Sequence, residues 1–137
     1  MLSAILAAAF LAGAPAPELK VDVGQANWAS LPQLRAVARG FPTADMVTKV
    51  HDMLGRDGCS VPGQRKVDFD FDVPYAVKVN PDGSADHVIV ADMHCPPLES
   101  YVGLIVLELA RRGDFRASAG SQPTWYASSL NFNLQWR

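Results

Sequence analysis

The chain has 137 residues, a length that fits one domain and leaves little room for a second hydrophobic core. Its 12 Lys and Arg residues against 14 Asp and Glu residues give a net charge of -2. This balance argues against a nucleic-acid-binding protein and provides no polybasic surface for anionic membranes. Beyond the apolar N-terminal residues, the composition is that of an ordinary soluble globular protein.

The N-terminal residues 1–16 are apolar and uncharged. Their apolar run is too short to span a bilayer, which takes about 20 residues, and it ends in Ala14-Pro15-Ala16-Pro17. This pattern predicts a secretory signal segment over 1–16, although no Lys or Arg precedes the run. The alternative is a buried N-terminal helix. With the leader removed, we expect no membrane span and a periplasmic location in a Gram-negative cell.

Residues 17–64 are predicted to form an N-terminal extension with a helix near residues 43–54. Thr43 fits the N-cap of this helix, and Gly55 would follow its end. A shorter helix is expected over residues 30–39. The apolar face of the helix near 43–54 consists of Met46, Val47, Val50, Met53 and Leu54, at helical spacing.

Residues 65–137 are predicted to form a second unit that begins with a long strand. Apolar and polar residues alternate from Val67 to Val79, which is typical of a strand with one buried face and one solvated face. Pro74 lies on the polar face and removes one ladder donor, so the strand should bend or become an edge there. The turn sequence at residues 80–83 then leads to a second strand over residues 86–93.

A helix and a final strand complete this unit. The helix is expected from about Leu98 to Arg112, and the strand from Trp125 to Trp136. The predicted fold class is therefore α+β, with a small antiparallel sheet in the order β-β-α-β packed on one helix. An additional N-terminal helix would be joined to it by a disulfide.

Cys59 and Cys95 are the only cysteines, so only one intramolecular pairing exists. In an oxidising compartment they are expected to form a disulfide, which would tie the helix near residues 43–54 to the end of the second strand. The alternatives are two buried free thiols or a metal site.

Five segments of the second half occur in a recognisable order: Val73–Val79, Pro81-Asp82-Gly83, Val88–Val90, Leu107–Phe115 and Leu130–Leu134. In this order and spacing they resemble the C-terminal domain of the TonB family, over roughly residues 66–136. The resemblance implies a domain that crosses the periplasm and pairs with a short peptide of an outer-membrane transporter. In that family a proton-driven motor of the inner membrane supplies the energy for transport across the outer membrane.

The physical basis of such binding is strand addition, in which an exposed sheet edge offers unpaired N–H and C=O groups to an extended peptide. We expect the final strand to be this edge. A second copy of the chain would compete with a ligand for the same groups, so a homodimer through the edge is an alternative partner. The residues expected to bind the peptide are Ser128, Ser129, Leu130, Asn131, Phe132, Asn133, Leu134 and Gln135.

The chain also departs from the motor-coupled members of the family. Its apolar segment is too short for a membrane anchor, residues 14–17 are its only spacer, and His94-Cys95-Pro96-Pro97 replaces the usual small polar turn. These departures favour a soluble, exported relative without an energy-transducing role of its own. The alternatives are a passive structural protein of the envelope, and a small metal-binding protein or hydrolase.

No residue set indicates catalysis, and we expect neither enzymatic activity nor a cofactor. The sequence has no Gly-x-Ser-x-Gly elbow and no Walker-type loop. Cys59 with His51 would form a nucleophilic pair only without the disulfide. No metal site is predicted either, because Asp92, His94 and a disulfide-bonded Cys95 supply too few ligands for zinc.

Two further groups have an ordinary structural interpretation beside a functional one. Asp68, Asp70 and Asp72 share one strand face, where a cation could bridge them, but a solvated strand face is the expected explanation. Trp125, Tyr126 and Trp136 bracket the final strand. They would be either a stacking platform or core residues.

Overall fold

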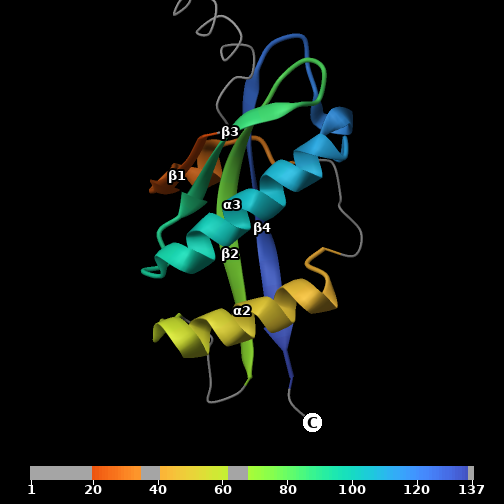
Figure 1. Cartoon of the computed structure of the whole chain (residues 1–137). Helices are drawn as coiled ribbons and strands as arrows, with labels where there is room; N and C mark the ends of the chain where they lie inside the picture. Colours follow the sequence, from red (N-terminus) through yellow and green to blue (C-terminus); the bar gives the residue numbers. More distant parts are fainter. Residues whose placement is uncertain (1–19, 35–40, 62–67, 136–137) are drawn as a thin grey trace, which may run out of the picture.

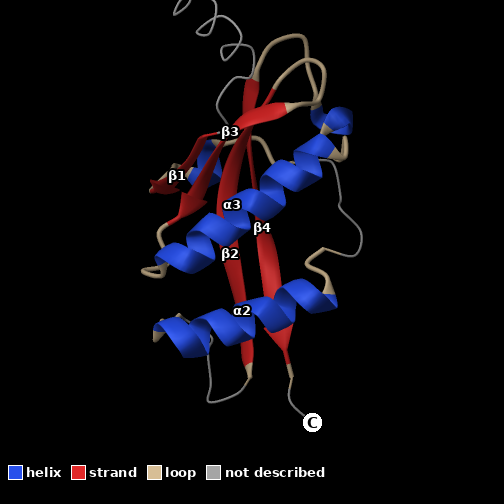
Figure 2. Cartoon of the chain, in the orientation of Figure 1, coloured by secondary structure: helices blue, strands red, loops and turns tan. Residues whose placement is uncertain are grey.

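The computed structural model describes residues 20–34, 41–61 and 68–135. Over these residues the chain forms a four-stranded sheet with two α-helices packed on one face (Figures 1 and 2). The predicted signal segment over residues 1–16 lies outside the described part. The elements in chain order are β1 (Lys20–Gly24), η1 (Trp28–Ser30), α2 (Ala44–Asp57), β2 (Phe69–Val79), β3 (Ala85–Ala91), α3 (Pro96–Arg111), η2 (Arg116–Ser118) and β4 (Thr124–Leu134).

The α+β class, the hairpin, both long helices and the final strand are confirmed. The predicted arrangement of the sheet was incomplete. The strand order is β1-β3-β2-β4, and β1 pairs with β3 in parallel, so the sheet is neither three-stranded nor wholly antiparallel. The sequence did not indicate β1, because this strand is only five residues long and alternates weakly.

Helix α2 begins where the sequence predicts and ends three residues later than predicted. The Thr43 hydroxyl accepts a hydrogen bond from the Met46 N–H at 3.2 Å, and Asp45 lies in the positive first turn. Gly55 remains helical. The left-handed residue that ends the helix is Gly58, with φ 68°.

Strand β2 is the long central strand, and Pro74 limits its pairing on one side. β2 pairs with β4 along its whole length, but its pairing with β3 stops at Tyr75. Proline has no N–H to donate to the β3 side. The expected edge at this position is therefore present. Beyond it a two-stranded extension continues, here called the lower ribbon: Phe69–Pro74 of β2 with Ser129–Leu134 of β4.

The core lies between the sheet and the two helices. Helix α2 covers the lower ribbon, and α3 covers β3 and β1. The rings of Phe69, Phe71 and Phe132 pack in sequence under α2, with centroids 5.4 and 5.7 Å apart. The buried residues of α2 and α3 that complete the core are Val50, Met53, Leu54, Leu98, Val102, Ile105, Val106 and Leu109.

The other face of the sheet is crossed by the segment that follows β1, here called the crossing segment (residues 25–34). It leaves β1 at one edge of the sheet, contacts β2 through η1 and reaches β4 at the opposite edge (Figure 1). Ala76 and Ala127 are consequently buried on a face that the alternation predicted to be solvated. The helix expected over residues 30–39 is wrong at its start, where Gln33 forms a β-bridge, and residues 35–39 lie outside the described part.

Candidate functional site

The predicted edge strand, β4, is an edge strand of the sheet. At its start the chain itself occupies the edge: the Ala127 N–H donates to the Pro32 C=O at 2.9 Å, and the Leu34 N–H donates to the Ala127 C=O at 3.0 Å. The backbone of Ala127 therefore points away from β2. Because this orientation alternates along an antiparallel strand, the backbone groups of Ser129, Asn131 and Asn133 point outward too.

These outward positions are open within the part of the chain that the structure describes. Among the described residues, the one bridge on this side of β4 joins Gln33 to Ala127. Ala127 is 4 % exposed, whereas the side chains of Ser129, Asn131 and Asn133 are all exposed. Gln135 is exposed as well and follows the end of the strand. The open edge thus consists of Ser129–Asn133, a span of roughly 17 Å for five strand residues.

The remaining predicted residues hold the strand in place. Ser128, Leu130, Phe132 and Leu134 occupy the alternate positions, whose backbone groups face β2. Leu130 and Phe132 are buried in the core, and Leu134 is partly buried against it. Ser128 lies opposite Tyr75, and the two side chains are hydrogen-bonded. Seven of the eight predicted residues therefore divide into an anchoring set of four and an outward set of three, and Gln135 lies beyond the end of the strand.

The Tyr75 phenol gives a pH-dependent prediction about the strand pair. Burial raises the pKa of Tyr75 from 10.0 to about 12, against a smaller lowering by the hydrogen bond with Ser128. Between pH 10 and 12 the unfolded chain loses this proton while the folded chain keeps it, so stability falls as the pH rises. We expect a loss on the order of 2–3 kcal/mol across this range.

Urea unfolding at pH 9 and above checks this prediction. Tyr75→Phe removes the titrating group, so this variant should show a flatter alkaline loss than the native protein. Equal alkaline slopes for the two proteins would contradict the prediction.

The outer face of the lower ribbon carries two of the three carboxylates in the predicted row. The Asn131 side-chain amide donates to Asp70 and to Asp72, at 2.9 Å in each case. The Asn131 amide therefore bridges the two carboxylates, in the position where the alternative interpretation placed a cation. Within the described ranges, no group of three His, Cys, Asp or Glu side chains is placed to hold a metal.

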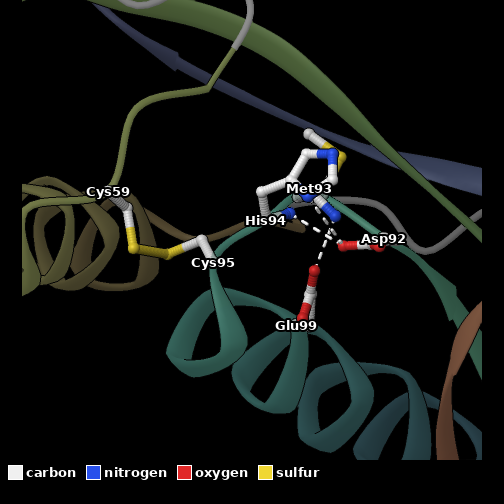
Figure 3. Close-up of a disulfide and its surroundings, with 6 residues drawn as sticks. All are labelled: Cys59, Asp92, Met93, His94, Cys95 and Glu99. Atoms are coloured by element: carbon white, nitrogen blue, oxygen red, sulfur yellow. Dashed lines mark hydrogen bonds and ion pairs between the residues drawn. A yellow bond between two sulfur atoms is a disulfide. The ribbon is translucent and has the colours of Figure 1, made fainter.

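The predicted disulfide is present. Cys59, just beyond α2, is bonded to Cys95, the N-cap residue of α3, with a Cα–Cα distance of 5.5 Å. It therefore joins the C-terminal end of one helix to the N-terminal end of the other (Figure 3). Neither cysteine is a free thiol, so Cys59 has no thiol with which to act as a nucleophile beside His51.

The turn before Cys95 is fixed by two carboxylates that point at its backbone (Figure 3). The buried Glu99 accepts a hydrogen bond from the Met93 N–H at 2.5 Å. Asp92 accepts one from the His94 N–H at 2.9 Å, and this bond lowers the pKa of the Asp92 carboxyl. His94 adopts a left-handed φ of 56°, and its side chain is exposed. These contacts give the turn a structural role.

The two described aromatic residues of the predicted group, Trp125 and Tyr126, do not form one stacking surface. Trp125 and Tyr126 are neighbours in a strand, so their rings lie on opposite faces of the sheet. The Trp125 ring packs against the His87 ring, with 4.8 Å between the ring centroids. The Tyr126 hydroxyl donates to the Ser118 C=O at 2.5 Å. Trp136 lies outside the described residues.

Sequence reasoning missed the residues that close the start of the edge, Pro32–Leu34, here called the clasp. Pro32 near Ser30 is typical of a helix start, and no local pattern marks a single bridge to a strand about a hundred residues later. The described segments include no helix with the length and apolar character needed to cross a membrane. In comparisons with known proteins, the chain matches no family model, no curated protein and no solved structure.

Proposed function

We propose that this protein is an exported binding module that pairs the open edge of β4 with an extended segment of another envelope protein. The observation that carries the proposal is the row of outward backbone groups at Ser129, Asn131 and Asn133, which have no strand partner among the described residues. An extended peptide satisfies such groups by adding a strand, and the side chains nearby set its specificity.

Two features support the envelope as the place of action. The Cys59–Cys95 disulfide is compatible with an oxidising compartment. The apolar residues 1–16 have the composition of a secretory leader. The choice of an outer-membrane transporter as the partner rests on the resemblance of residues 66–136 to the TonB C-terminal domain alone. That choice is the most specific part of the proposal.

Crosslinking in the periplasm and outer membrane, followed by affinity capture, tests the proposal. Asn131→Pro removes one outward N–H from the open edge and leaves the bonds to β2 in place, because prolines are tolerated on edge strands. We expect the native protein to capture a partner and this variant to lose about tenfold in yield, since one ligand hydrogen bond disappears and the proline ring lies on the side from which the ligand strand approaches.

Asn131→Ala is the matched control, because it removes the amide that bridges Asp70 and Asp72 but keeps the backbone N–H. It should retain capture. Asn133→Pro repeats the test at an outward position should Asn131→Pro fail to fold by circular dichroism. Equal capture by folded proline variants would contradict strand addition at this edge. A captured second copy of the chain would identify the edge as a dimer interface instead.

A further inference from the structure

The clasp shows where strand addition on this edge stops. It pairs with β4 in parallel through two backbone hydrogen bonds, and both bonds are made to Ala127. The next bond of such a ladder would run from the Ser129 N–H to the Leu34 C=O. Both residues are described, and this hydrogen bond is not formed between them. Ala127 is therefore occupied by the chain itself, and the open edge begins at Ser129.

The side chains beside the open edge define the chemistry of a ligand. A strand added to β4 would place every second side chain on the outer face, next to Ser129, Asn131 and Asn133. The outer face of the lower ribbon carries only acidic or neutral residues at its strand positions. Its two carboxylates, Asp70 and Asp72, are exposed, and both accept a hydrogen bond from the Asn131 side-chain amide. Long basic side chains can reach across one strand to such carboxylates.

We propose that the ligand of the open edge is a short extended peptide with basic side chains at alternate positions, and that the clasp marks one end of its footprint. This inference rests on the proposed function and names its partner class. The peptide would pair with the outward backbone groups of Ser129, Asn131 and Asn133. The paired part of the peptide would be about five residues long. Its basic side chains would lie on the outer face, above Asp70 and Asp72.

The probe is a synthetic peptide of about seven residues that alternates Lys and Val, with blocked ends, titrated into the labelled full chain and followed by NMR. We expect the amides of Ser129, Asn131 and Asn133 to shift, and that of Ala127 to stay in place. The double variant Asp70→Asn, Asp72→Asn should weaken binding roughly fivefold, because partly screened surface charges each contribute little. Asparagine still accepts from Asn131, so the strand pair is retained.

A clasp variant tests the boundary. Leu34→Pro removes the N–H that donates to the Ala127 C=O and leaves the clasp with one bond, from the Ala127 N–H to the Pro32 C=O. We expect the peptide to displace this weakened clasp, so the Ala127 amide should shift in this variant alone. A shift of Ala127 in the native protein would overturn the boundary. Equal binding of a matched peptide with Glu in place of Lys, or no shift on β4 with the Lys peptide, would overturn the ligand chemistry.

The two proposals can fail separately. Capture from the envelope could depend on the Asn131 N–H while the Lys peptide shifts no amide of β4. This result would support strand addition and contradict a basic ligand. Equal capture by the native protein and by Asn131→Pro would contradict the proposed function. It would also contradict the inference about the ligand, which rests on that function.

Discussion

Reducing the disulfide between Cys59 and Cys95 is expected to lower the free energy of unfolding by about 4 kcal/mol. The bond closes a loop with a sequence separation of 36 residues. A crosslink over a loop of this length removes chain entropy from the unfolded state equivalent to about 4 kcal/mol. Domains of this size typically have only about 5–15 kcal/mol in total, so reduction should remove at least about a quarter of the free energy of unfolding.

Urea unfolding with and without reductant measures this effect. Cys59→Ala with Cys95→Ala is the matched control, since alanine leaves no hydroxyl beside the fully buried Cys95 position. The double variant should show the lowered stability under both conditions and no further response to reductant. A change below about 1 kcal/mol on reduction would contradict the prediction and show that the unfolded chain stays compact without the crosslink.

The loss should also be uneven along the chain. Helix α2 is held to the rest of the molecule by the disulfide, by its packing on the lower ribbon and by contacts with α3, whereas α3 lies over β3 and β1. Hydrogen exchange in reductant should therefore speed up first in α2. Uniform acceleration in both helices would indicate that the molecule unfolds as one unit.

Local signals were sufficient for most of the fold. Thr43 and the apolar face ending at Leu54 predicted α2, and the alternation from Val67 to Val79 predicted β2 within two residues of its start. The position of β4 at a sheet edge was also predicted from the sequence. Each of these elements is specified by residues that are close together in the chain, so pattern and propensity suffice.

The parts that the sequence did not reveal depend on contacts between distant residues. β1 has five residues, and its place beside β3 depends on the absence of a side chain at Gly103 in α3. The clasp depends on a single bridge between Gln33 and Ala127. Neither leaves a periodic pattern in the sequence. The predicted edge began at Ser128, so the sequence did not indicate that Ala127, directly before it, is occupied by the chain itself.

Substituting Gly103 with Ala is expected to displace β1 from the sheet. A Cβ at this position would lie 2.3 Å from Val21 Cγ1 and 3.1 Å from Val21 Cβ. Valine is stiff at χ1, so the strand itself has to shift. Alanine gains about 1 kcal/mol of helix propensity over glycine, whereas overpacking of this kind costs about 1–3 kcal/mol. We expect a net loss, with fast hydrogen exchange over residues 21–24.

The double variant Gly103→Ala, Val21→Ala is the control, because it removes both atoms nearest to the new methyl group. It should restore protection in β1, although the smaller side chain at position 21 buries less apolar area. Protection of β1 in the single variant, with a raised free energy of unfolding, would contradict the prediction. That outcome would mean that the helix gain exceeds the cost of moving Val21.

The same substitution should reach the binding edge. β1 fixes the start of the crossing segment, and the clasp is the other end of that segment. With β1 released, the described contacts that still hold the clasp are its two backbone hydrogen bonds to Ala127, the partly buried Leu34 and the packing of η1 on β2. The Ala127 amide should then exchange faster in Gly103→Ala, while the inward amides of Leu130 and Phe132, which face β2, keep their protection. A helix residue that contacts β1 would thereby control how much of β4 is open to a ligand.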